Sequence, residues 1–316
     1  MNYVSNLCLL LAFFASSTFA SEKSEMREAS TSLRQLAEKN LRSSSASFHT
    51  SAKEFWTQYS ARFAQLAKVD VPKLSNEELE ASVEVFAGMA SVGAQIPRSS
   101  NLNPAVKETA EAALASFIEI SSRRKPTFVE AAMTYSAIFG LREWELEARM
   151  RSALGPLQNL PHIVDDPGLG AKRSLWYLDP DLLTMKRVAF EPTEDVKWIV
   201  IALADCPVAR EAIADITSDS KLAKLFTGRS LWITAPGPDA MSFPSVFVWN
   251  AKYPQFAIKF IHHWDEWPML DIRPDSPTFI RIENDRVVGV HSGWGTGEHL
   301  PRNRKVLIEL DAKTAP

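Results

Sequence analysis

The stretch that most constrains this chain runs from Trp198 to Ile216 and reads WIVIALADCPVAREAIADI. It opens with five apolar residues that are β-branched at their centre, which is typical of a strand buried on both faces of a sheet. Polar residues interrupt the run at Asp205. Apolar residues then return at helical spacing, at Val208, Ala212, Ile213 and Ile216. The stretch therefore predicts a buried strand, a turn and a helix.

Cys206 occupies the turn between that strand and that helix. Pro207 suits the first position of the helix, because its missing N–H would have had no partner there. Unpaired backbone N–H groups and the positive end of the helix dipole favour a thiolate at this place. Asp205 opposes ionisation of the thiol, and Arg210, one turn further on, offsets that effect. Cys206 is therefore the candidate catalytic residue, with Asp205 and Arg210 as the residues that tune it.

A second informative stretch extends from Asp275 to Trp294 and reads DSPTFIRIENDRVVGVHSGW. Two runs rich in β-branched residues flank the polar residues ENDR, which is the pattern of a β-hairpin.

Together the two stretches resemble the thioredoxin-like fold, over about Lys186–Trp294, and in particular the exported members of that family. In that family a strand delivers a C-x-x-C motif to a helix N-terminus. A later x-Pro-Thr-Phe segment, with its proline in cis, lies against the reactive cysteine. The resemblance implies an α/β domain with a central mixed sheet flanked by helices. It also implies a substrate-binding wall formed by Ser276, Pro277 and Thr278.

Two departures from the family pattern decide what the site could do. Ala209 stands where the second cysteine should be, and Val200 stands near the position of the family's buried acid. The resemblance then implies a monothiol oxidoreductase, in which Cys206 forms a mixed disulfide with a protein client or a small thiol and a second thiol resolves it. The alternative is a redox-inactive thioredoxin-fold module that binds an extended polypeptide or partner protein beside Ser276–Thr278. The reactivity of Cys206 distinguishes the two hypotheses.

The N-terminus has the pattern of a secretory signal peptide. An apolar run over Leu7–Phe19 ends in small residues at Thr18 and Ala20, which predicts a leader over residues 1–20. The run is shorter than the ~20 residues that a membrane span needs, so we expect no span once the leader is removed. Cys8 would leave with the leader, and the mature chain would hold Cys206 as its single cysteine. We expect an exported protein, in the bacterial periplasm or cell envelope.

The composition divides the mature chain into two domains. Residues 21–160 carry apolar residues at three-to-four spacing, which predicts an all-α helical domain that supplies a partner or homo-oligomer surface. Within it, Ser75 and Glu78 have the spacing of a capping box, and Pro126 opens a helix predicted to continue to Gly155. Residues 161–171 are dense in Gly, Pro and Asp and predict a linker. Residues 172–316 form the predicted α/β domain. Its further strand candidates are 185–190, 231–235, 246–249 and 256–261, and Leu222–Phe226 is expected to prolong the helical region that follows Cys206.

Several other functions find little support in the sequence. A net charge of −3 gives no reason to expect nucleic acid as a partner. His262 and His263 would point to opposite faces of a strand, so we expect no metal site and no cofactor. The glycines of Gly293–Gly297 lack the Gly-Lys-Ser/Thr of a phosphate loop. The remaining aromatic cluster is expected to pack around the rim of the sheet, and comprises Trp264, Trp267 and Trp294.

Overall fold

The computed structural model describes residues 31 and 57 and most of 68–312. Within that span it does not describe residues 94–102, 142, 155–159, 171, 180, 182, 192, 194, 235–242, 263–265, 271–275 and 296–299. The predicted leader and the C-terminal residues 313–316 lie outside the described part. The described residues divide into two units between Ile163 and Val164.

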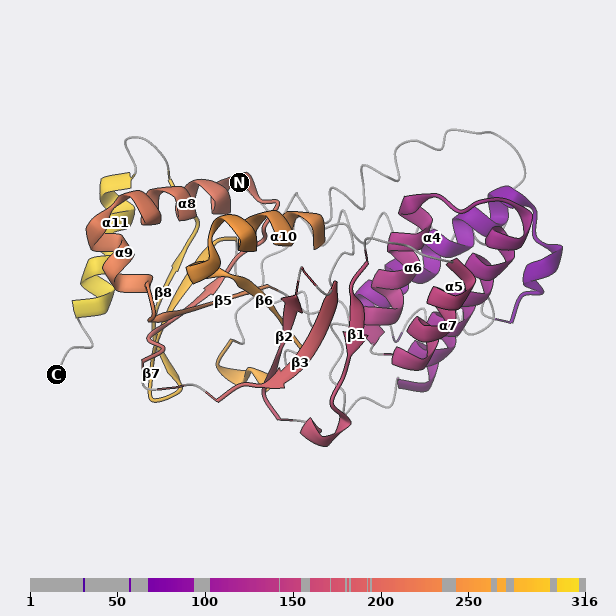
Figure 1. Cartoon of the computed structure of the whole chain (residues 1–316), viewed down its shortest axis with the longest axis horizontal. Coiled ribbons are helices and arrows are strands. Elements are labelled where there is room, and N and C mark those ends of the chain that lie inside the picture. Colours follow the sequence, from indigo (N-terminus) through magenta and orange to yellow (C-terminus); the bar gives the residue numbers. More distant parts are fainter. Residues whose placement is uncertain are drawn as a thin grey trace. The chain divides into compact units, whose positions relative to one another are not determined.

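The described part of the first unit is largely helical. A short 3₁₀ turn, η1 (Val71–Lys73), precedes α4 (Asn76–Gly93), α5 (Asn103–Arg123), α6 (Phe128–Leu141) and α7 (Trp144–Leu154). In Figure 1 these helices lie together, and α4 and α7 each pack against α5 and α6. The side chains between them are Leu79, Val83, Ile120 and their neighbours. The amphipathic spacing of the sequence is therefore satisfied by helix-to-helix packing.

The predicted capping box at the start of α4 is confirmed. The backbone N–H of Glu78 donates to the hydroxyl of Ser75 at 3.3 Å, and the backbone N–H of Ser75 donates to the Glu78 carboxylate at 2.9 Å. The single helix predicted from Pro126 to Gly155 is wrong, because it is divided into α6 and α7. The division falls at Glu143, whose N–H reaches back to the Ile138 carbonyl while its own carbonyl accepts from Glu147.

A second capping box opens α6 and carries a buried charge. The Glu130 carboxylate accepts a hydrogen bond from the backbone N–H of Thr127 at 2.7 Å. The Thr127 hydroxyl in turn accepts one from the backbone N–H of Glu130 at 3.2 Å. The Arg124 guanidinium donates to both Glu130 carboxylate oxygens, at 2.5 and 3.0 Å. Burial raises the pKa of Glu130, but the hydrogen bonds from Arg124 and Thr127 outweigh it and hold the pKa below its usual value.

We expect Glu130→Gln to destabilise the first unit by about 1–2 kcal/mol near neutral pH, the size of a charge-assisted hydrogen bond or a helix cap. A carboxylate with a depressed folded-state pKa contributes stability above its unfolded value, here 4.5, and loses it as the pH falls through the folded value. The difference between wild type and variant should therefore shrink below about pH 4.5. Urea unfolding followed by circular dichroism measures it. Glu108→Gln, an exposed carboxylate on α5, is the matched control. A difference that stays constant with pH would contradict this assignment.

The chain forms a mixed eight-stranded sheet with the strand order β1-β3-β2-β6-β5-β4-β7-β8, and every strand after β1 belongs to the second unit. Strands β4, β5 and β6 run parallel, whereas β7 pairs antiparallel with β4 and with β8. The strands are β1 (His162–Val164), β2 (Ser174–Asp179), β3 (Thr184–Ala189), β4 (Trp198–Ile201), β5 (Ser230–Thr234), β6 (Ile258–Ile261), β7 (Thr278–Glu283) and β8 (Arg286–Ser292). The helices are α8 (Pro207–Ser218), α9 (Ser220–Phe226), α10 (Phe243–Lys252) and α11 (Leu300–Ala312). The second unit is thus an α/β arrangement with flanking helices (Figure 1).

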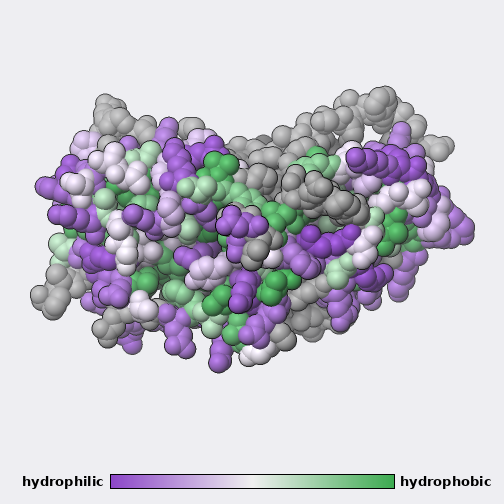
Figure 2. Space-filling view, viewed as in Figure 1, coloured by the Kyte–Doolittle hydropathy of each residue, from purple (hydrophilic) through white to green (hydrophobic). Residues whose placement is uncertain are grey.

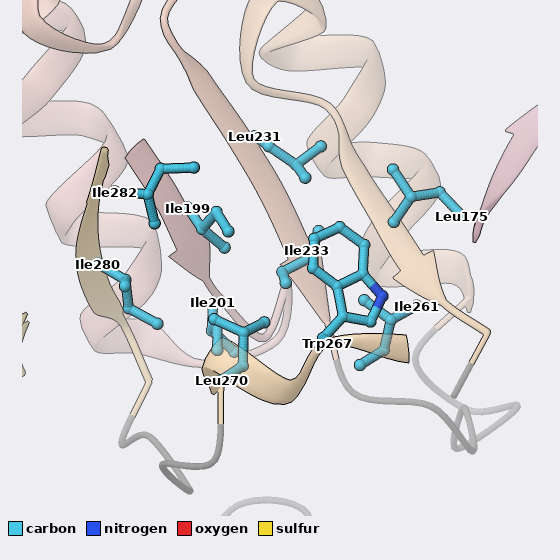
Figure 3. Close-up of a cluster of buried hydrophobic side chains, with 10 residues drawn as sticks. All are labelled: Leu175, Ile199, Ile201, Leu231, Ile233, Ile261, Trp267, Leu270, Ile280 and Ile282. Carbon is cyan, nitrogen blue, oxygen red and sulfur yellow. The ribbon is translucent and has the colours of Figure 1, made fainter. Parts of the chain in front are cut away.

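The two faces of the sheet bury different side chains. On one face, aliphatic residues of the central strands pack under Trp267 and Leu270, the latter from η6 (Pro268–Leu270), as Figure 3 shows. On the other face, Trp198 and Phe279 meet Phe226 of α9, and Trp232 meets Trp249 of α10. Successive residues of a strand point to opposite faces, so the apolar runs of β4, β5 and β7 supply both layers.

The predicted strand over 246–249 is wrong, because these residues belong to α10. Val246 and Trp249 are buried whereas Val248 is 67% exposed, which is helical rather than alternating periodicity. The strand predicted over 256–261 is shorter than expected, since Phe256 closes η4 (Pro254–Phe256) and β6 begins at Ile258. Residues 222–226 belong to a separate helix, which Asp219 caps by accepting from two backbone N–H groups.

The segment predicted as a linker also differs from expectation. It contains β1 and a 3₁₀ turn, η2 (Pro167–Leu169). The Arg187 guanidinium of β3 donates to the Gly170 carbonyl at 2.7 Å and to the Asp165 carboxylate at 3.4 Å. The density of turn residues in the sequence did not indicate these contacts with Arg187.

The described residues that can be seen in Figure 2 include both hydrophobic and hydrophilic ones. On the face seen in Figure 2, the hydrophobic residues form small separate areas among hydrophilic ones. Exposed large apolar side chains in the described part are Ile118, Phe128, Val164, Tyr177, Val188, Val248, Val288 and Val290. Among the described residues, no helix combines the length and apolar character that crossing a membrane requires.

Candidate functional site

Cys206 is the N-cap residue of α8, directly after the turn that follows β4. Its backbone is extended, with φ −69° and ψ 118°, and Pro207 occupies the first turn as expected. All four residues of β4 are buried, so the strand fixes the start of the turn from within the core. Cys206 itself is half-buried and is not in a disulfide. The first turn of α8 contains no acidic residue, and no side chain of the described residues caps it. The backbone N–H groups of this turn therefore lie at the same end of the helix as Cys206.

The segment before β7 lies against this cysteine. The Ser276–Pro277 peptide bond is cis, and the Sγ atom of Cys206 is 3.7 Å from the Ser276 carbonyl oxygen. The Ser276 hydroxyl accepts a hydrogen bond from the backbone N–H of Leu203 at 3.0 Å. The expected cis bond and the expected contact across 70 positions of sequence are therefore both confirmed.

The three predicted substrate-binding residues are not equally accessible. Ser276 is half-buried, whereas Pro277 and Thr278 are buried. The Pro277 carbonyl accepts from Gly293 at 2.8 Å, and the hydroxyls of Thr278 and Ser292 lie 3.0 Å apart. Of the predicted wall, Ser276 is thus the residue that an approaching molecule could reach.

The hairpin β7–β8 returns to the cysteine-bearing helix. Gly293 follows β8 with a φ of +80°, a left-handed conformation that glycine adopts without steric cost. The indole N–H of Trp294 then donates to the Asp215 carboxylate of α8 at 2.8 Å. This bond was not predicted from the sequence. The Gly-Trp pair at the end of the hairpin was the available signal, because a buried indole N–H seeks an acceptor. Trp294 packs on Phe279 while Trp267 packs on the opposite face, so these two tryptophans do not form the single predicted cluster.

The two predicted tuning residues take different places. Arg210 is exposed, and its Nε atom donates to the Ala204 carbonyl at 2.8 Å, so it holds the turn that precedes Cys206. Asp205 is half-buried, and its Oδ1 atom is buried without a hydrogen-bond partner in the described part of the chain.

The two positions at which the sequence departs from the family pattern are both buried in the core. Ala209, where a second cysteine would stand, is 0% exposed, and Val200 of β4 is 0% exposed as well. The immediate surroundings of Cys206 therefore supply neither a resolving thiol at Ala209 nor a carboxylate at Val200.

A buried polar cluster on β2 and β3 is the largest feature that the sequence analysis missed. The Glu266 carboxylate accepts from the N–H and hydroxyl of Ser174, at 2.9 and 3.0 Å, and lies 3.5 Å from the Arg187 guanidinium. The Arg187 Nε atom donates to the same Ser174 hydroxyl at 2.8 Å. His262 accepts from the Trp176 indole at 3.2 Å, so it belongs to this packing. The available signal in the sequence was an arginine within the predicted strand 185–190, which indicates a polar partner if that strand is buried but does not identify it.

Among the described residues, no group of three or more His, Cys, Asp and Glu side chains is placed to hold a metal ion. His263 and Trp264 lie outside the described part. Comparisons of the chain with models of protein families, with curated proteins and with solved structures find no match in any of the three.

Proposed function

We propose that this chain is an exported thioredoxin-like protein that carries out thiol–disulfide exchange through the single cysteine Cys206. The observation that carries the proposal is the 3.7 Å approach of Cys206 Sγ to the Ser276 carbonyl. The contact brings together the N-terminus of α8, which follows the buried strand β4, and the segment that precedes the antiparallel strand β7. That juxtaposition is the one that the resemblance implies for a thiol site.

The exchange needs no cofactor. The Cys206 thiolate attacks one sulfur of a client disulfide, forming a mixed disulfide and expelling the other sulfur as a thiolate, which takes up a proton. A second thiol, as its thiolate, then attacks the client sulfur of the mixed disulfide. The client leaves joined to that second thiol, and Cys206 returns as a thiolate. Because Ala209 offers no sulfur, the second thiol comes from another molecule, such as glutathione.

The redox-inactive module is the second candidate function, and the burial around the thiol favours it. Cys206 is half-buried, and its contact with the Ser276 carbonyl suits a neutral S–H donor. In that case the Ser276 segment binds an extended polypeptide or partner protein, and Cys206 serves as a small packing residue.

The proposal is tested with oxidised glutathione and intact-mass analysis of the full chain. The Cys8→Ser protein holds Cys206 as its single cysteine, and we expect it to gain one glutathione and to lose it on adding excess reduced thiol. The matched control, which carries Cys206→Ser in the same Cys8→Ser background, should remain unmodified. The same spectrum tests the proposed export, since leader removal gives a mature chain that begins at Ser21.

One pattern of results would replace the first candidate by the second. If the native Cys8→Ser protein gains no glutathione, while the same protein unfolded in urea gains one, then Cys206 is shielded by the fold. The thiol–disulfide proposal then fails, and the binding module is the remaining function.

A further inference from the structure

We propose that Ser276 is a positioning residue that restrains Cys206, holding the thiol against a carbonyl oxygen until an incoming molecule displaces it. The inference deepens the proposed function and rests on it. It assigns Ser276 a role toward the protein's own cysteine, in addition to the substrate contact that the resemblance implies.

The turn that carries Cys206 is closed on itself. The Cys206 N–H donates to the Leu203 carbonyl at 3.0 Å, and the Cys206 carbonyl accepts from the Arg210 N–H at 3.1 Å as α8 begins. Ala202, the residue before Leu203, still donates its N–H to the Ile233 carbonyl of β5 at 2.9 Å. The N–H of Leu203 comes where sheet pairing ends, and the Ser276 hydroxyl at 3.0 Å provides its acceptor.

Ser276 therefore touches the turn at two points. Its hydroxyl binds the first residue of the turn, and its carbonyl lies 3.7 Å from the Sγ atom at the last. Both groups belong to one residue, so the hydroxyl bond fixes the carbonyl relative to the sulfur. Leaving the Leu203 N–H without an acceptor in this half-buried turn would cost free energy, so its hydrogen bond to the Ser276 hydroxyl stabilises the contact between the two segments.

The Ser276 carbonyl oxygen is placed to accept a hydrogen bond from the Cys206 S–H, at 3.7 Å. This bond must break before the sulfur can react, because the S–H proton is lost when the sulfur attacks. The thiolate is the nucleophile in alkylation and in disulfide exchange. The charged neighbours are Asp205, which precedes the thiol, and Arg210, which is bonded to the Ala204 carbonyl. Neither contacts the Ser276 hydroxyl through any hydrogen bond in the described part, so replacing that hydroxyl leaves both in place.

The test measures the rate at which iodoacetamide alkylates Cys206 near neutral pH, in a Cys8→Ser background that leaves one thiol. We expect Ser276→Ala to raise the rate about three- to tenfold, the range that loss of one hydrogen bond supports. Ser276→Thr, which keeps a hydroxyl, should restore the slow rate. Ser276→Val, which matches threonine in shape but lacks the hydroxyl, should be fast. A purely structural role would not separate threonine from valine.

Ser292→Ala is the matched control, because its hydroxyl meets Thr278 rather than the turn, and it should leave the rate unchanged. Thermal unfolding shows whether each variant is folded. Should Ser276→Ala fail to fold, the threonine and valine pair still decides the question. The proposal is overturned if valine and threonine variants react equally fast, or if loss of the hydroxyl slows alkylation.

Alkylation also separates this inference from the proposed function, because it needs no disulfide exchange. If the threonine and valine variants differ as expected but glutathione forms no adduct, the exchange function fails and the restraint stands. If glutathione forms the adduct but the variants do not differ, the restraint alone fails.

Discussion

Glu266→Ala is expected to lower the free energy of unfolding of the second unit by about 3 kcal/mol, because it removes one partner of a buried ion pair. The Arg187 and Glu266 side chains are 4% and 3% exposed. Without the carboxylate, the Ser174 N–H loses its acceptor and the guanidinium keeps Asp165, at 3.4 Å, as its anionic partner. The replacement thus removes the acceptor of the Ser174 N–H and one carboxylate that faces the buried guanidinium.

Guanidinium unfolding followed by tryptophan fluorescence measures the loss. Seven of the nine tryptophans of the chain follow Ile163, so the signal reports mainly on the second unit. Glu309→Ala is the matched control: its carboxylate pairs with Lys305 at 3.8 Å on the exposed side of α11, and such a pair contributes at most about 1 kcal/mol. Equal losses for the two variants would show that the buried cluster does not stabilise the sheet. Glu266→Gln, which keeps an acceptor for Ser174, should lose less than the alanine variant.

The parts of the fold that the sequence predicted correctly are those that local chemistry determines. The apolar run of β4, the proline after Cys206 and the polar turn between β7 and β8 each act within a few residues. The Ser75 and Glu78 capping box is equally local. The contact between Cys206 and Ser276 is not local, and it was accessible only because two separate stretches together resembled one family.

The failures share a different cause. The apolar residues of 246–249 suit a strand or a helix, and the four residues do not include the contact of Trp249 with the distant Trp232. Arg187 and Glu266 are 79 positions apart in the sequence, and the residues next to each of them do not indicate that they pair. The restraint of Cys206 by the Ser276 hydroxyl likewise depends on where sheet pairing of Leu203 ends, which a single sequence does not reveal.

Phe279→Ala is expected to destabilise the second unit by about 3–5 kcal/mol, the usual cost of deleting a fully buried phenylalanine. Phe279 is 0% exposed and pairs with Val200 across β4 and β7. Its ring centroid lies 5.6 Å from that of Phe226, 6.4 Å from Trp232 and 5.5 Å from Trp294. Alanine therefore leaves a cavity that α9, β5 and the end of the hairpin all border.

The position of Phe279 links this core to the candidate site, since Thr278 alone separates it from Pro277. A ring wedged between Phe226 and Trp294 fixes the strand that carries Ser276 toward Cys206, so the cavity should also change the alkylation rate of the thiol. Denaturant unfolding gives the stability loss, and Phe279→Leu, which fills part of the cavity, should lose less. Val248→Ala, at a position 67% exposed on α10, should change stability by no more than about 0.5 kcal/mol. A Phe279→Ala loss as small as that of the control would contradict the proposal that these rings position the strand.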